Sequence, residues 1–159
     1  MRAAIRFFRE DAATGNEFGT DGVNVFVGGI SAGAVMSAVA AVLDEGDNIS
    51  EAVADYLAVS GGMAGNSSDN TEFSSEASGV LQISGAIRRL SWIEPGDPPI
   101  YAAHEEFDPV VPCNTLPGIA FVLFGLALTS SGACDMIPAA RDLGIPTGFF
   151  LEKLSLIHI

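Results

Sequence analysis

One stretch of the chain constrains its fold more than any other, residues 22–43 (GVNVFVGGISAGAVMSAVAAVL). The run from Val23 to Val27 is β-branched and aromatic, which predicts a buried strand. Residues 32–43 are almost entirely Ala, Val, Met and Leu, which predicts a buried helix. A buried strand that leads directly into a buried helix is typical of a parallel sheet covered by helices.

The turn between this strand and this helix has the pattern G-x-S-x-G, from Gly29 to Gly33. Glycines two positions before and after Ser31 let the strand and the helix approach each other, while the serine hydroxyl projects outward. The N–H of Ala32 begins the helix and can donate to a developing oxyanion. Ser31 is therefore a candidate nucleophile and Ala32 a candidate oxyanion donor. The alternative is a glycine-rich turn with an incidental serine; a dinucleotide-binding fingerprint is excluded because it requires glycine where Ile30 stands.

The rest of the chain alternates between predicted strands and predicted helices. Strands are predicted at 80–84, 100–104 and 149–151, and helices at 2–13, 50–59 and 135–143. This alternation predicts an α/β fold with a mainly parallel sheet and helices on both faces. Residues 61–75, rich in Gly, Ser and Asn, are predicted to form a surface loop.

Some details of these elements are specific enough to test. The helix at 2–13 is amphipathic, so we expect its apolar stripe against a sheet and its arginines in solvent. These arginines are Arg2, Arg6 and Arg9. Ser50 is the expected N-cap of its helix, and Asp135 the expected N-cap of another, with Pro138 near the first turn. Trp92, the only tryptophan, is interpreted as a packing residue, with an acyl pocket as the alternative.

Composition narrows the class of protein. The 159 residues suffice for one domain, and 48% hydrophobic against 17% charged residues is typical of a globular chain. A net charge of −13 repels nucleic acid and anionic membranes, so neither is an expected partner. The most apolar run, 118–128, is too short to cross a bilayer about 30 Å thick. The sequence shows no signal peptide at its start, and its acidity favours a secreted or periplasmic location without identifying one.

Cysteine and histidine are both scarce. Cys113 and Cys134 are expected to be two isolated thiols, with a disulfide as the alternative if the protein is exported. Because there is no C-x-x-C pattern and only two histidines, we expect no metal site. No cofactor motif is present.

A serine nucleophile needs a base, and the base needs an orienting carboxylate. Asp108 is the best candidate acid because it follows the strand at 100–104, and functional groups collect at the carboxyl ends of parallel strands. An aspartate before Pro109 is also typical of an Asx turn with no catalytic role.

Four segments resemble the α/β-hydrolases, and specifically the carboxylesterases and polyhydroxyalkanoate depolymerase-like esterases. They are RAAIRFF (2–8), FVGGISAGA (26–34), SWI (91–93) and DPVVP (108–112), in the order that family has them. The resemblance covers most of residues 1–150. It implies Ser31 as nucleophile, Asp108 as triad acid, a small-molecule or polymeric ester as substrate, and no cofactor. His104 precedes the acid, so the family order implies a structural role for it.

The chain departs from the family pattern at both ends. Several strands and a His-Gly loop that supplies the second oxyanion donor precede the family's equivalent of Arg2, so residues 1–154 are predicted to be a partial domain. His158 follows Asp108 at about the place expected for the triad base. However, residues 155–159 resemble translated sequencing-adapter sequence and form a tail of doubtful origin. His158 is therefore either the base or an incidental terminal residue.

The sequence thus predicts a serine hydrolase that cleaves carboxylic esters through an acyl-enzyme on Ser31. Two alternatives stay open. One is a peptidase or acyltransferase on the same scaffold, and the other is a catalytically inactive fragment of such an enzyme.

Overall fold

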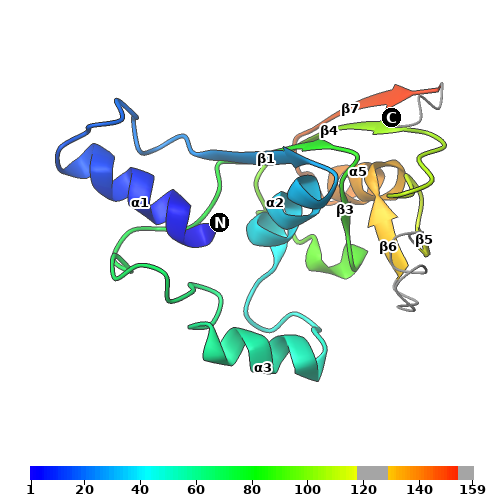
Figure 1. Ribbon diagram of the computed structural model, residues 1–159. Helices are drawn as coiled ribbons and strands as arrows, with labels where there is room; N and C mark the ends of the chain where they lie inside the picture. The colour runs from blue at the N-terminus through cyan, green and yellow to red at the C-terminus, as the bar shows by residue number, and fades with distance from the viewer. Residues whose placement is uncertain (118–128, 154–159) are drawn as a thin grey trace.

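The fold is built on one parallel sheet. A computed structural model of the chain describes residues 1–117 and 129–153 (Figure 1). The sheet has the order β1-β2-β4-β7, and each of its three strand pairings is parallel. Its strands are β1 (Phe26–Ile30), β2 (Gly79–Ile83), β4 (Ile100–Glu105) and β7 (Thr147–Glu152). The predicted α/β fold is confirmed, although β1 begins three residues later than the run of β-branched residues suggests.

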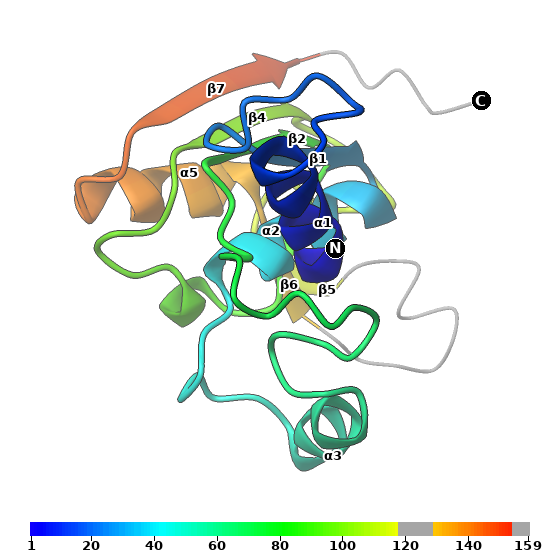
Figure 2. The ribbon, with the colours of Figure 1, turned by 90° about the vertical axis from the view of Figure 1, so that its left-hand side faces the viewer.

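Two helices pack on the sheet, α2 (Ala32–Val42) and α5 (Ala133–Asp142). Both helices lie on the same face of the sheet. Figure 2 shows the sheet edge-on, with the two helices below the strands. The core between them and the strands is a single cluster of apolar side chains. Its members include Val27, Val80 and Ile100 from the strands, and Ala38, Val42, Met136 and Ile137 from the helices. Full burial of each large apolar side chain contributes about 1.5–3 kcal/mol to folding.

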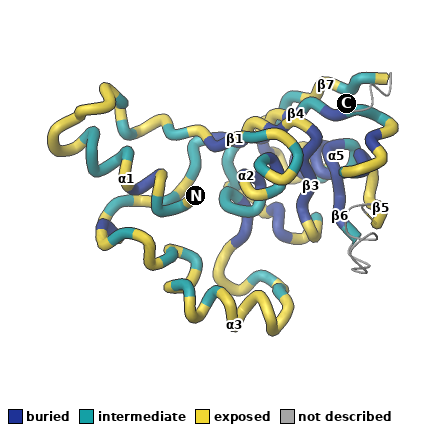
Figure 3. The backbone as a smooth tube through the Cα atoms, in the orientation of Figure 1, coloured by how far each residue is buried: buried dark blue, intermediate teal, exposed yellow. Residues whose placement is uncertain are grey.

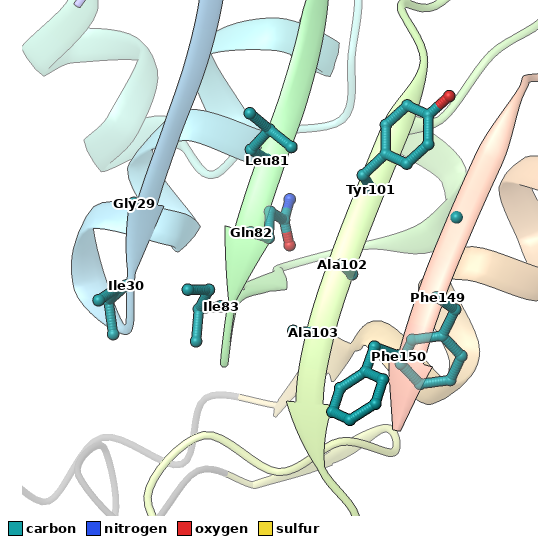
Figure 4. A pocket seen from close by; sticks show the side chains of 11 residues that line it. Gly29, Ile30, Leu81, Gln82, Ile83, Tyr101, Ala102, Ala103, Phe149 and Phe150 are labelled. Atoms are coloured by element: carbon teal, nitrogen blue, oxygen red, sulfur yellow. The ribbon is translucent and has the colours of Figure 1, made fainter. Parts of the chain in front are cut away.

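The opposite face of the sheet is exposed. Leu81 pairs with Tyr101, and Ile83 and Phe150 both pair with Ala103, so these side chains form adjacent apolar rows. They line a shallow groove of ≈ 560 Å³ (Figure 4). Helices were expected on both faces; in the described residues no helix packs on this one.

The helix α1 (Arg2–Ala13) forms as predicted, but its surroundings differ from the prediction. Figure 1 shows it beyond the start of β1 rather than across the sheet. Arg6 is fully buried and donates three hydrogen bonds into the loop at 61–75. Their acceptors are Ala64 O (2.7 Å), Ser68 Oγ (3.0 Å) and Asn70 Oδ1 (3.4 Å). The expectation that all three arginines face solvent is wrong, because Arg6 is buried. Arg2 and Arg9 also donate hydrogen bonds to backbone carbonyls.

The helix α3 (Glu51–Val59) begins at its predicted N-cap. Ser50 Oγ accepts from the N–H of Val53 at 3.4 Å. None of the residues of α3 is buried, and Figure 3 shows the helix apart from the buried centre of the molecule. Trp92, in a short 3₁₀ helix (Leu90–Trp92), is buried in the core, and its Nε1 donates to Asn48 O at 3.4 Å. This favours the packing interpretation of Trp92.

The structure contains a small antiparallel sheet that was not predicted from the sequence. It has the order β3-β6-β5, with β3 (Ala86–Ile87), β6 (Thr129–Gly132) and β5 (Leu116–Pro117). The helix α5 starts directly after β6, which places Asp135 in its first turn rather than at its N-cap, and Pro138 in its interior. The N-cap is Gly132, so the N-cap expected at Asp135 is wrong by three residues, and the placing of Pro138 near the first turn is also wrong.

Cys113 and Cys134 form a disulfide. The expectation of two isolated thiols is wrong, because the fold brings together two side chains that are 21 residues apart in the sequence. Within residues 1–117 and 129–153, no helix is long and apolar enough to cross a membrane. The apolar run at 118–128 and the tail at 155–159, including His158, lie outside the described residues.

Candidate active site

Ser31 occupies the turn between β1 and α2 in a strained backbone conformation. Its φ of 54° and ψ of −121° lie in a region that residues with a side chain rarely adopt. Such a conformation costs of the order of 1–3 kcal/mol and clusters at functional sites. The N–H of Ser31 donates to Ile83 O at 2.9 Å, which ties the turn to the end of β2. The turn is thus held by the neighbouring strand.

The two glycines of the motif are not equivalent. A Cβ at Gly29 would lie 2.5 Å from the carbonyl carbon of Gly33, so the close approach of helix and strand requires glycine at position 29. A Cβ at Gly33 would meet no atom within 4 Å. The close approach predicted from the sequence is therefore a property of Gly29.

The Ser31 hydroxyl and the N–H of Ala32 make no hydrogen bond within α2. The Ser31 side chain makes no capping hydrogen bond to α2, which leaves its Oγ available for other partners. Ala32 is the first residue of α2, so its N–H has no acceptor within the helix. The partial positive charge at a helix N-terminus favours negative charge at this point. A hydroxyl and an anion-stabilising N–H are therefore adjacent.

Asp108 is buried just beyond the end of β4. Its Oδ1 accepts from the N–H of Val110 at 2.8 Å and from that of Val111 at 2.9 Å. The Asx turn considered from the sequence is present, and it fixes the carboxylate in place. Because β1 and β4 are parallel and separated only by β2, Ser31 and Asp108 follow strands that end at the same edge of the sheet, with strand axes roughly 10 Å apart.

His104, on β4, is buried, and backbone groups engage both of its ring nitrogens. Its Nε2 lies 2.8 Å from Val111 O, and its Nδ1 lies 3.5 Å from the N–H of Ala133. The donor at Nε2 and the acceptor at Nδ1 correspond to the Nε2-protonated neutral ring. His104 Nε2 is also 3.9 Å from Asp108 Oδ2. The structural role inferred for His104 from the sequence stays a prediction.

The described residues do not complete the site. His158 lies outside them, so its assignment as triad base stays a prediction. Within residues 1–117 and 129–153, no group of three or more His, Cys, Asp or Glu could hold a metal ion. Sequence reasoning missed the pair formed by Thr115 and Asp135, which borders the Asp108 segment. No local pattern links two residues twenty positions apart.

Among the comparisons with known proteins, only the one with solved structures finds matches. No family model matches the sequence, and no curated protein matches it. The structure is similar to a truncated form of a carbohydrate esterase from gut microbiota, with a TM-score of 0.65 and 17% identity over 94% of this chain and 57% of that one. It is also similar to esterase 2 of Thermogutta terrifontis phosphorylated by paraoxon, with a TM-score of 0.61 and 18% identity over 94% of this chain and 48% of that one. The propionate-bound form of that esterase gives a TM-score of 0.60 at 16% identity, over 94% and 51%.

These similarities define the class of fold. The chain has the α/β fold of these esterases, as its parallel sheet and strand–turn–helix at Ser31 already indicate. It spans about half the length of the structures that it matches. The finer resemblance to carboxylesterases and polyhydroxyalkanoate depolymerase-like esterases stays a prediction.

Proposed function

We propose that this chain carries the nucleophile of a serine hydrolase that cleaves carboxylic esters. The observation that carries the proposal is Ser31 itself. It is held at positive φ between β1 and α2, with an Oγ that does not cap the helix. The fold is that of esterases, of which one solved form is phosphorylated by paraoxon and another is propionate-bound. Both facts about that esterase fit an enzyme that binds acyl or phosphoryl groups.

The proposed reaction has two halves. Ser31 Oγ attacks the ester carbonyl as its proton passes to a histidine, and the N–H of Ala32 stabilises the tetrahedral oxyanion. The histidine then gives that proton to the departing alcohol, which leaves the acyl group on Ser31. Water, activated by the same histidine, attacks the acyl-enzyme and releases the carboxylate. Asp108 orients the histidine, and His158 is our candidate for it.

The oxyanion site of this proposal has one donor. Only Ala32 is assigned as a donor, and loss of one donor typically lowers kcat by about 10²–10³. The second candidate function is a catalytically inactive chain that associates through the apolar sheet face, which no described helix covers. The two functions differ in whether Ser31 is reactive.

The test is labelling of the purified chain by a fluorophosphonate probe, beside the variant Ser31→Ala. The matched control is Ser67→Ala, which removes an exposed serine from the loop at 61–75. Labelling that disappears only in Ser31→Ala supports the hydrolase, and hydrolysis of p-nitrophenyl acetate should follow the same pattern. A folded chain that does not label would overturn the activity and leave the inactive fragment.

A further inference from the structure

The segment that follows Asp108 is attached to the start of α5 by groups that take no part in the proposed reaction. We call these groups the α5 clamp and define it as the Cys113–Cys134 disulfide together with the Thr115–Asp135 pair. The first partner of each pair lies within seven residues of Asp108. The second partner lies in the first turn of α5.

The disulfide is the covalent part of the clamp. Cys113 is fully buried, and the N–H of Cys134 donates to the carbonyl of Cys113 at 2.9 Å. The two segments are in such close contact that a Cβ at Gly132 would lie 2.2 Å from Pro112 O. A disulfide closing a loop of about this length is typically worth around 3 kcal/mol. The chain is therefore fixed five residues beyond Asp108.

Asp135 is the polar part of the clamp. Its Oδ2 accepts from the N–H of Thr115 at 2.6 Å and from Thr115 Oγ1 at 2.7 Å. These hydrogen bonds, the one from the Thr115 hydroxyl first, hold the pKa of Asp135 below its ordinary value. Asp135 is therefore ionised at neutral pH, and charge-assisted hydrogen bonds of this kind are shorter and stronger than neutral ones.

We infer that the α5 clamp positions Asp108, with Asp135 and the disulfide acting as positioning residues. The Asp108 carboxylate is oriented by the N–H groups of Val110 and Val111, so its placement depends on the path of the segment that carries them. His104 holds that segment at Val111 O, and the clamp holds it at Cys113 and beyond. A site built on loops loses precision when its supporting contacts are removed. The functional part of this inference rests on the proposed role of Asp108 as the triad acid.

The first test measures the segment directly, without activity. Amide hydrogen exchange is followed in the full chain for the wild type, Asp135→Asn and the double variant Cys113→Ser/Cys134→Ser. The control is Asp142→Asn, which removes an exposed carboxylate from the other end of the same helix. We expect peptides covering Val110 and Val111 to exchange about tenfold faster in the clamp variants, with no change in the control or in peptides from β2.

The second test measures the consequence at Ser31. Thr115→Val keeps the shape of the side chain but removes the hydroxyl that bonds to Asp135 and to Ser131. Thr115→Ser keeps that hydroxyl and loses only the methyl group. We expect the rate of fluorophosphonate labelling to fall about tenfold in Thr115→Val and to stay close to the wild-type rate in Thr115→Ser. A labelling rate that depends on the hydroxyl, and not on the methyl group, separates positioning from a general loss of packing.

The outcomes distinguish the inference from the proposed function. Unchanged exchange at Val110 and Val111 in both clamp variants overturns the inference, whatever the activity. Faster exchange with an unchanged labelling rate also overturns it, because the segment would then not govern the site. A wild-type chain that does not label overturns the proposed function, and the exchange data still decide whether the clamp holds the segment.

Discussion

Two residues of one motif, Gly29 and Gly33, show how differently the same amino acid is used. Gly29 has the backbone of Gly33 against the place where its Cβ would be, whereas Gly33 faces open space. Only the first glycine of the G-x-S-x-G pattern is required by a close contact.

This asymmetry predicts opposite effects of the two alanine substitutions. Gly29→Ala should lower the free energy of unfolding by about 2–3 kcal/mol, because a backbone atom cannot move aside as a flexible side chain can. Gly33→Ala should raise it by a few tenths to about 1 kcal/mol, because alanine is the better helix former. Urea denaturation of both variants checks this, and equal effects would contradict it.

Asp97 is an aspartate whose ionisation is opposed by its surroundings in the folded chain. Burial raises its pKa to about 6, with further increases from the negative charges of Asp44, Glu94 and Asp47, and the N–H of Glu94 opposes these increases. Because the folded pKa lies above the unfolded value of 3.8, ionised Asp97 destabilises the folded chain. The penalty is absent below about pH 4 and grows as the pH rises through about 6.

Asp97→Asn should therefore stabilise the protein at pH 7.5 and not at pH 4. We expect a gain of about 1 kcal/mol, reduced from the full linkage value because the side chain is partly solvated. Asp55→Asn, on the exposed helix α3, is the control for loss of one negative charge. Denaturation at the two pH values is the measurement, and a gain that does not depend on pH would contradict the assignment.

At the scale of elements, α1 is held by arginine side chains as well as by apolar packing. Ile5 is the one buried apolar residue of the helix. The buried side chain of Arg6 donates to one backbone carbonyl, one serine hydroxyl and the amide oxygen of Asn70. The guanidinium fork reaches three acceptors at once, which an ammonium group cannot do in the same geometry. The loop at 61–75 and α1 therefore depend on each other.

Replacing Arg6 should release both elements together. Arg6→Met keeps much of the side-chain volume but leaves three acceptors, of which Asn70 is buried, without their donor. We therefore expect the free energy of unfolding to fall by about 2 kcal/mol. Arg89→Met, at an exposed position, should have little effect. Limited proteolysis should cut the loop at 61–75 faster only in the first variant, and similar cutting in both would contradict this account.

At the scale of the whole molecule, the dominant feature is the sheet face that no described helix covers. Its apolar rows run across the strands from Ile30 and Ile83 to Phe150, and include Tyr101 over Gly148. Leu81 is 55% exposed, Tyr101 49% and Phe150 64%. The largest apolar patch of a typical monomer is about 300–600 Å² and is often functional. An exposed face of this size should bind hydrophobic dyes.

A charge in the middle of the face should weaken that binding. Leu81→Lys is expected to lower anilinonaphthalene sulfonate fluorescence by about half, because it interrupts the apolar rows. Val59→Lys places the same charge on α3, where Val59 is 78% exposed but isolated from the face. Equal fluorescence losses in the two variants would show that the dye binds elsewhere or responds only to net charge.

The parts of the structure that the sequence determined are local. The strand–turn–helix around Ser31, the N-cap at Ser50 and the alternation of strands with helices follow from patterns that repeat within a few residues. Backbone dihedrals and capping hydrogen bonds respond to neighbours in the chain, so these features are readable without the fold. The same holds for Asp108, whose Asx turn is formed by the next three residues.

The tertiary structure decided the features that join distant residues. The strands β3, β5 and β6 have two to four residues each, too few to show a period of two, and they exist because they pair with one another. The Cys113–Cys134 bond, the burial of Arg6 and the Thr115–Asp135 pair each join residues 20 or more positions apart. Their contact depends on how the sheet and helices pack, because side chains so far apart along the chain meet only after the backbone between them has folded.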